Sequence, residues 1–258
     1  MKTVSVHSPQ IIAHRGASRA EHENTIAAFR RAGALGADAV ELDVRALARS
    51  PRPLAPPLVV HHDALLADGR ALGDLGAGDV PAHVPTLDAA LDACSPLWVN
   101  VEIKNAEGEA GFDPTDGIAD AVVAALRARP EPAATWLISS FRMETVDRCR
   151  AVEPEIRTAW LTVGGPELAT RRGIDSVVEL VRERGHQALH PFYAYVTAEL
   201  VHACHDAGLA LNAWTCDEPE RMQEMARWGV DGICTNVPDV ALAALRGPGG
   251  YHAEGLED

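Results

Sequence analysis

The sequence predicts an α/β fold, a closed (β/α)8 TIM barrel. Short apolar runs rich in β-branched residues alternate with segments of helical period almost to the end of the chain. The chain forms strand–helix units of roughly 25 to 35 residues, and eight of them suit a barrel. A length of 258 residues with 47% hydrophobic residues is enough for one large core. An open doubly wound sheet is the alternative, because strand order cannot be read from one sequence.

Segments of helical period follow the predicted barrel strands. The strands are expected near Ile11–His14, Ala39–Val44, Leu97–Lys104, Thr135–Ser140, Arg157–Val163, Ala188–Pro191, Ala210–Thr215 and Gly232–Thr235. Helices are expected at Asn24–Leu35, Leu87–Ala93, Asp116–Arg129, Asp175–Arg184, Thr197–Ala207, Glu218–Trp228 and Asp239–Arg246. Caps agree with these bounds: Asn24, Asp116 and Thr197 at helix starts, and Gly36, Gly185, Gly208 and Gly229 at helix ends.

One further strand, Leu58–His62, breaks the alternation. The segment before it, 45–57, contains four prolines, which exclude the helix that a parallel crossover normally needs. We therefore expect a small antiparallel excursion that returns His62 to the rim reached by Asp43. Asp63–Pro85, rich in Gly and Asp, is expected to form a loop over that rim.

No linker divides the chain, so we expect a single domain over residues 1–246. The excursion and its loop form an insertion at about 45–85 after the second strand. The Gly-rich, acidic segment 247–258 is expected to be a flexible tail.

Composition narrows the classes of partner. The net charge of -14 repels nucleic acid and anionic membrane surfaces. The chain has no run of 18 apolar residues and no apolar signal core, so no stable membrane insertion is expected. The five cysteines are widely spaced without a C-x-x-C pair, which is typical of reduced core thiols in a cytoplasmic protein. The oligomeric state stays open.

Acidic side chains stand where adjacent strands end. Glu41 and Asp43 are two residues apart and so share one face of a strand, as do Glu102 and Lys104. An inward-facing carboxylate costs several kcal/mol unless it is paired or bound to a metal. All-oxygen ligands favour a hard divalent cation, Mg²⁺ or Ca²⁺, with Mn²⁺ also possible. Structural ion pairs with arginines are the alternative interpretation.

Two histidines and two cations stand at the same rim. His14 and His62 are a candidate acid/base pair, because imidazole accepts or donates a proton near pH 7. His61 is expected to point the opposite way, and His190 also lies near a strand end. Arg15 and Lys104 supply fixed positive charge, and a phosphate would use a metal, an arginine and a lysine together.

Several common motifs are absent: G-x-x-x-x-G-K-[ST], G-x-S-x-G, H-E-x-x-H and a strand-linked G-x-G-x-x-G. Their absence argues against an NTPase, a serine hydrolase, a zincin and a dinucleotide oxidoreductase.

Ordered sequence segments over about residues 11–240 resemble the glycerophosphodiester phosphodiesterase family. The matching segments are Ile11–Ser18, Glu23–Phe29, Gly36–Val44, Val59–Asp63, Pro85–Leu87, Val101–Lys104, Ile138–Phe141, Ala213–Thr215 and Gly229–Asn236. Three departures stand out: His22 where the family usually has Pro, the longer Ala46–Pro57 segment, and Cys216-Asp217 where a small apolar residue and Asn are common. None removes a catalytic group.

The resemblance implies a TIM barrel that hydrolyses glycerophosphodiesters to glycerol 3-phosphate and an alcohol. By family likeness, the metal ligands are Glu41, Asp43 and Glu102, and the acid/base pair is His14 and His62. The likeness also assigns Arg15 and Lys104 to the phosphate and Trp214 to the glycerol side of the pocket.

Three questions stay open at this stage. Attack by a substrate hydroxyl, through a cyclic phosphate, is not separated from direct attack by water. A lysophospholipase D type activity on a lipid phosphodiester is an alternative on the same site, as is a non-catalytic barrel that binds a phosphoglycerol. The leaving alcohol is not specified.

Overall fold

The computed structural model describes residues 8–48 and 56–247. Within them, eight parallel strands close into a barrel, which confirms the predicted fold class. They are β1 (Gln10–His14), β2 (Ala39–Ala46), β4 (Trp98–Ile103), β5 (Trp136–Ser140), β6 (Arg157–Thr162), β7 (Ala188–Pro191), β8 (Ala210–Ala213) and β9 (Gly232–Thr235). Pairing of β1 with both β9 and β2 closes the ring, so the open sheet is excluded.

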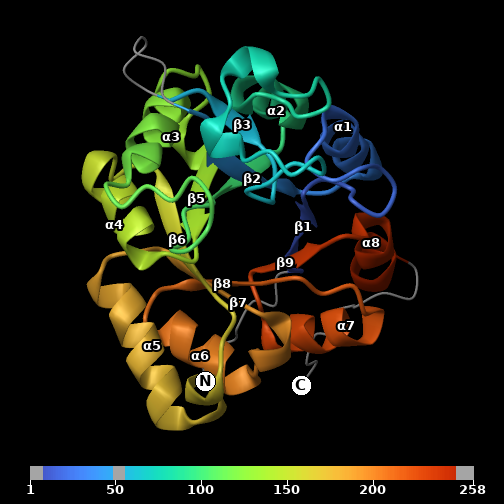
Figure 1. Cartoon of the computed structure of the whole chain (residues 1–258). Helices are drawn as coiled ribbons and strands as arrows, with labels where there is room; N and C mark the ends of the chain where they lie inside the picture. Colours follow the sequence, from blue (N-terminus) through green and yellow to red (C-terminus); the bar gives the residue numbers. More distant parts are fainter. Residues whose placement is uncertain (1–7, 49–55, 248–258) are drawn as a thin grey trace, which may run out of the picture.

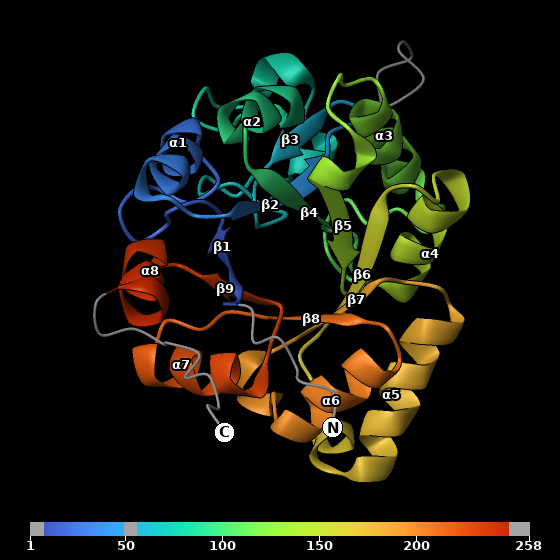
Figure 2. The same cartoon turned by 180° about the vertical axis from the view of Figure 1, so that it is seen from behind.

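Helices surround the strands on the outside of the ring (Figures 1 and 2). They are α1 (Ile26–Leu35), α2 (Leu87–Cys94), α3 (Gly117–Arg127), α4 (Met143–Val152), α5 (Arg171–Glu183), α6 (Ala198–Asp206), α7 (Pro219–Trp228) and α8 (Pro238–Arg246). Periodicity does not predict the bounds of α4, because its buried face is narrow and includes Thr145 among Met143, Val146 and Cys149.

Two predicted caps are wrong, and the side chains of both residues instead form bonds at the carboxyl end of the barrel. Thr25, not Asn24, caps α1 by accepting a hydrogen bond from the backbone of Ala28. Asp116 precedes α3 but its side chain makes no capping bond; it contacts Arg142 and Thr145. The predicted cap at Thr197 is confirmed by its bond from the backbone N–H of Leu200.

The predicted antiparallel excursion is confirmed. β3 (Leu58–Val60) pairs antiparallel with β2, with Val44 opposite Val60. The chain then crosses in front of the strand ends in Figure 1 and behind them in Figure 2. Two short 3₁₀ turns, Leu72–Asp74 and Ala77–Asp79, punctuate this loop.

The loop has a small core of its own, which fixes it over the rim. The buried residues of this core are Leu47, Val59, Leu66, Leu72 and Val84. Burial of large aliphatic side chains stabilises by about 1.5–3 kcal/mol each. The excursion is thus a packed structure, and His62 stands at its base.

Other sequence expectations fall partly outside the described residues. The tail predicted at 247–258 lies beyond them from residue 248 onward, and part of the proline-rich segment, 49–55, also lies outside. All five cysteines are free and buried, as expected for core thiols. None of the helices over residues 8–48 and 56–247 has the length and apolar character to cross a membrane.

Candidate active site

Strand register brings the predicted acidic residues together at the carboxyl end of the barrel. Asp43 of β2 pairs with Glu102 of β4, and Glu41 pairs with His14 of β1. One carboxylate oxygen from each of Glu41, Asp43 and Glu102 lies within 4.8 Å of the others. Side chains far apart in sequence therefore form one cluster, which is suitable for a metal ion.

Burial makes this cluster electrostatically expensive. Asp43 is fully buried, and Glu41 and Glu102 are only 3% and 6% exposed. Burial raises the pKa of Glu41 to about 8, with repulsion from Asp43 in the same direction. Burial likewise raises the pKa of Glu102 to about 7. Three buried carboxylates this close together can all be ionised only if strong positive charge lies beside them.

Two cations supply part of that charge. Lys104 contacts Glu102 and lies 3.0 Å from Asp43 Oδ1 through its Nζ. Arg15 Nε lies 3.1 Å from Asp43 Oδ2, while its Nη1 is bonded to Glu23. Burial alone would raise the pKa of Asp43, but Lys104 and Arg15 outweigh it and hold this pKa well below its usual range. Lys104 and Arg15 thus stabilise the ionised form of Asp43 more than the ionised forms of Glu41 and Glu102.

Buried oxygen atoms without hydrogen-bond partners are a structural sign that this cluster is suitable for a divalent cation. Glu41 Oε1 and Asn100 Oδ1 are buried and accept no hydrogen bond from the described residues. A buried oxygen without a partner costs about 1–3 kcal/mol, more when charged. Hard oxygen donors of this kind suit Mg²⁺ or Ca²⁺ and suit Zn²⁺ less well.

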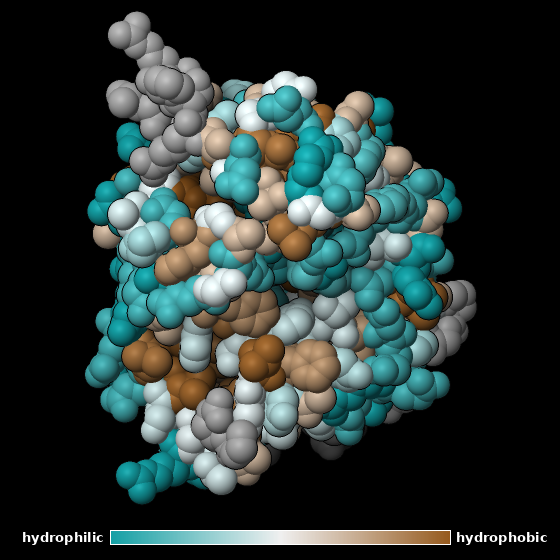
Figure 3. Space-filling model, in the orientation of Figure 1, coloured by the Kyte–Doolittle hydropathy of each residue, from teal (hydrophilic) through white to brown (hydrophobic). Residues whose placement is uncertain are grey.

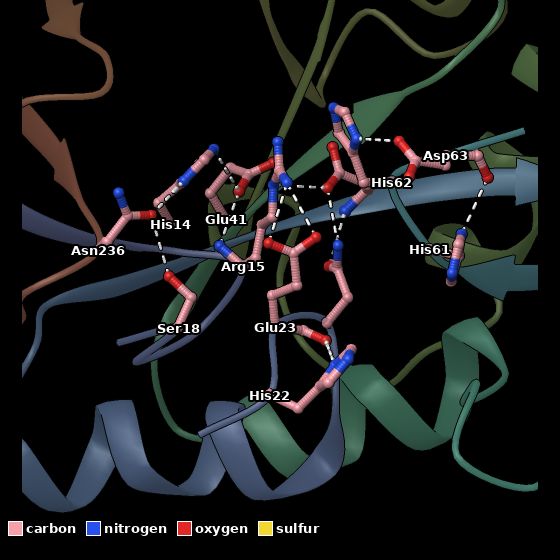
Figure 4. A network of polar contacts seen from close by, with 12 residues as sticks. His14, Arg15, Ser18, His22, Glu23, Glu41, His61, His62, Asp63 and Asn236 are labelled. Atoms are coloured by element: carbon pink, nitrogen blue, oxygen red, sulfur yellow. Dashed lines mark hydrogen bonds and ion pairs between the residues drawn. The ribbon is translucent and has the colours of Figure 1, made fainter. Parts of the chain in front are cut away.

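His14 lies beside the cluster, where Figure 4 shows it next to Glu41 and Asn236. Its Nδ1 is 2.7 Å from Asn236 Oδ1, and its Nε2 is 4.0 Å from Glu41 Oε2. Burial, followed by the charge of Arg15, lowers the pKa of His14. A neutral ring with one nitrogen directed at the cluster is suitable for proton transfer.

His62 lies across Glu41 and Arg15 from His14 in Figure 4. Its Nδ1 is 2.7 Å from Asp63 Oδ1, and the Nε of Arg45 donates to its backbone carbonyl at 2.7 Å. Burial lowers the pKa of His62 despite the opposing charge of Asp43. His61 is turned away in Figure 4, with its Nδ1 against the backbone oxygen of Asp63. This separation of the two rings agrees with their predicted opposite directions.

Trp214 follows β8 and contributes an aromatic wall. Its Nε1 donates to the carbonyl of His190 at 2.8 Å. The rings of Phe141 and Phe192 meet it edge-on, with centroids 5.2 and 5.6 Å away. Trp214 also lines a small cavity of about 20 Å³ with His14, Glu41 and Glu102, so the structure brings it to the acidic cluster.

Several residues that support the site were not predicted as site residues. Asn24 donates from Nδ2 to Asp43 Oδ2 at 2.7 Å and has a positive φ of 56°. Asn236, Asp217 and Arg45 support the two histidines or their backbone. Arg45 shares the face of Asp43 by its two-residue spacing, a signal that was available. The others are adjacent to the cluster only through the fold.

His190 lies in the barrel interior, where it lines the same small cavity as Glu41 and Glu102, and we expect it to make the fold sensitive to acid. It is buried, and burial, then Arg157, lowers its pKa to about 3. Because the unfolded chain binds this proton near pH 6.5, stability from neutral His190 is present above that pH. It is lost as pH falls toward 3, by about 1.4 kcal/mol per pH unit.

Chemical denaturation of His190→Gln between pH 7 and 4 checks this expectation. Glutamine retains an acceptor for the Asn212 amide, which lies 2.9 Å from His190 Nε2. The variant should show a shallower fall of unfolding free energy with acid than the parent. Parallel curves for the two proteins would contradict it.

Comparison with known proteins adds to this geometry. The sequence model of the Glycerophosphoryl diester phosphodiesterase family matches residues 14–240. A glycerophosphodiester phosphodiesterase of Caldanaerobacter subterraneus subsp. tengcongensis is 30% identical, over 92% of this chain and 97% of that protein.

Solved structures share the fold. A glycerophosphodiester phosphodiesterase from Thermotoga maritima is 24% identical, with a TM-score of 0.72 over 91% of this chain and 97% of that one. An Oleispira antarctica phosphodiesterase, solved with the product sn-glycerol-3-phosphate, is 23% identical, with a TM-score of 0.76 over 91% and 96%. Since the family match covers most of the chain, this protein belongs to the glycerophosphoryl diester phosphodiesterase family and is a glycerophosphodiester phosphodiesterase.

Proposed function

We propose that this enzyme hydrolyses glycerophosphodiesters to glycerol 3-phosphate and an alcohol in a metal-dependent reaction with His14 and His62 as acid and base. The observation that carries the proposal is the meeting of three buried carboxylates, two histidines and two cations at one rim. The family membership supports the reaction class. The substrate is a small molecule, and the free thiols agree with a cytoplasmic location.

The cationic side chains and the histidines would have different roles in the reaction. Arg15 and Lys104 would bind the phosphate oxygens, since both are already held at the cluster by Asp43. One histidine would take the proton from the attacking hydroxyl or water. The other would give a proton to the alcohol oxygen as the phosphorus–oxygen bond to that alcohol breaks. Trp214 would bound the glycerol side.

Glu41, Asp43 and Glu102 would hold one divalent cation, Mg²⁺ or Ca²⁺, with Mn²⁺ also suited to this oxygen set. When bound, the cation would polarise the phosphoryl group and offset negative charge in the transition state. It would also stabilise the ionised form of the two glutamates.

Hydrolysis of glycerophosphocholine and glycerophosphoethanolamine tests the proposal. We expect release of glycerol 3-phosphate with added Mg²⁺ or Ca²⁺, measured by a coupled assay. Thermal stabilisation by glycerol 3-phosphate with no turnover of either diester would instead indicate a non-catalytic phosphoglycerol-binding barrel.

Exposed apolar residues favour a second candidate activity, of lysophospholipase D type. Four large ones follow strands or the excursion at this end: Leu65, Phe141, Val163 and Tyr195, each at least 38% exposed. Apolar surface is visible on this side of the molecule in Figure 3. Such residues could contact an acyl chain. Faster turnover of lysophosphatidylcholine than of glycerophosphocholine, under matched conditions, would favour it.

A further inference from the structure

A polar connection joins the ends of β8 and β9 to His14. Asp217 follows β8, and Asn236 directly follows β9. Asp217 Oδ1 accepts from the backbone N–H of Asn236 at 2.8 Å and from the hydroxyl of Thr235 at 2.9 Å. Asp217 Oδ2 accepts from Asn236 Nδ2 at 2.8 Å. In all three bonds the Asp217 carboxylate is the acceptor.

This carboxylate fixes which way the Asn236 amide faces. A carboxylate only accepts hydrogen bonds, so the amide NH2 of Asn236 must point at Asp217. The amide oxygen then points the other way, 2.7 Å from His14 Nδ1 and 3.0 Å from the Ser18 hydroxyl. Figure 4 shows the contacts of Asn236 with both His14 and Ser18. The reversed amide would place its oxygen against a carboxylate oxygen.

The tautomer of His14 follows from the amide direction. An amide oxygen cannot donate, so the hydrogen of a neutral His14 must lie on Nδ1. The lone pair is then on Nε2, which is directed toward Glu41 at 4.0 Å. We propose that Asp217 and Asn236 are positioning residues that hold His14 in the Nδ1–H tautomer, with Nε2 free to take a proton from the attacking group. This inference rests on the catalytic role proposed for His14.

Asp217→Asn tests the inference, because it nearly preserves shape while it reverses polarity. The introduced amide keeps the bonds from the backbone of Asn236 and from Thr235 only if its NH2 faces the Asn236 side chain. Asn236 must then turn over and present its own NH2 to His14, which favours the Nε2–H tautomer. We expect kcat to fall by about 10²-fold with KM within about threefold, as for loss of a partner that orients a catalytic group.

Three measurements decide between this role and a merely structural one. Long-range ¹H–¹⁵N spectra of the imidazole nitrogens, assigned with His14→Gln, should show Nδ1–H in the parent and Nε2–H in Asp217→Asn. Exchange of the pair, D217N/N236D, should restore the parent tautomer and at least tenfold in kcat, since the relocated carboxylate would accept from both the new amide and His14. Asp231→Asn, at the opposite end of the same strands and bonded to the Leu211 backbone, should change neither.

An Nε2–H tautomer in the parent, or an unchanged tautomer and kcat in Asp217→Asn, overturns the inference. So does a double variant as slow as the single one when thermal unfolding shows that both are folded. These outcomes are distinct from failure of the proposed function, which would appear as absent turnover in the parent, whose tautomer is still measurable by NMR.

Discussion

His14→Ala is expected to lose about 10²–10⁴-fold in kcat on glycerophosphodiesters, the usual scale for removal of a general acid or base. His14 is the ring with one nitrogen facing the carboxylate cluster and the other bonded to Asn236. Alanine removes the proton carrier but leaves Glu41 and its bond from the Arg15 backbone in place. Steady-state kinetics on glycerophosphocholine, with saturating Mg²⁺, measures the loss.

His61→Ala is the matched control, because His61 is turned away from the cluster and its ring nitrogen bonds the backbone of Asp63. It should retain kcat within about threefold, as is usual for surface changes. Full activity of His14→Ala would defeat its assignment as acid or base. Equal losses in both variants would point to damage to the rim instead.

Removal of divalent metal is expected to abolish measurable turnover, with at least about a 10³-fold loss, since a bound cation contributes several kcal/mol to transition-state stabilisation. Glu41→Gln should act in the same direction by removing one of the three ligand carboxylates. EDTA treatment followed by readdition of Mg²⁺, Ca²⁺ or Mn²⁺ measures the first effect. Isothermal titration with each cation measures how much Glu41→Gln weakens metal binding, and the same kinetic assay measures its loss of turnover.

Melting temperatures of Glu41→Gln with and without metal separate an effect on metal binding from an effect on folding. Burial raises the pKa of Glu41 to about 8, so without the cation the neutral Gln should be tolerated. We therefore expect Glu41→Gln to keep its melting temperature without metal but to lose metal-induced stabilisation. Undiminished activity after exhaustive chelation would refute the metal requirement. A diffraction experiment on crystals soaked in a divalent ion should place density among Glu41, Asp43 and Glu102.

Much of the fold follows from local pattern. The alternation of strands and helices predicts the barrel, and the prolines of 51–57 predict the antiparallel return of β3. Residue spacing on single strands also predicts which acids share a face. The assigned roles of these residues stay predictions, although the structure brings all of them to one rim.

The missed features depend on partners distant in sequence. Asn24 looks like a helix cap because it precedes a helical period, yet its side chain is bonded to Asp43, which no local rule reveals. Asn236 contacts His14 across 222 positions. The first contact depends on the pairing of β1 with β2 and the second on closure of the ring between β1 and β9, so residue spacing within one element cannot predict either.

The bond between His14 and Asn236 joins the first strand of the ring to the residue after the last one. A partly assembled chain, with β9 not yet seated, would contain both acid-bearing strands but lack the anchor for this imidazole. If His14 acts in catalysis as proposed, turnover requires the closed ring, and recovery of turnover after denaturation would report that β9 has paired with β1.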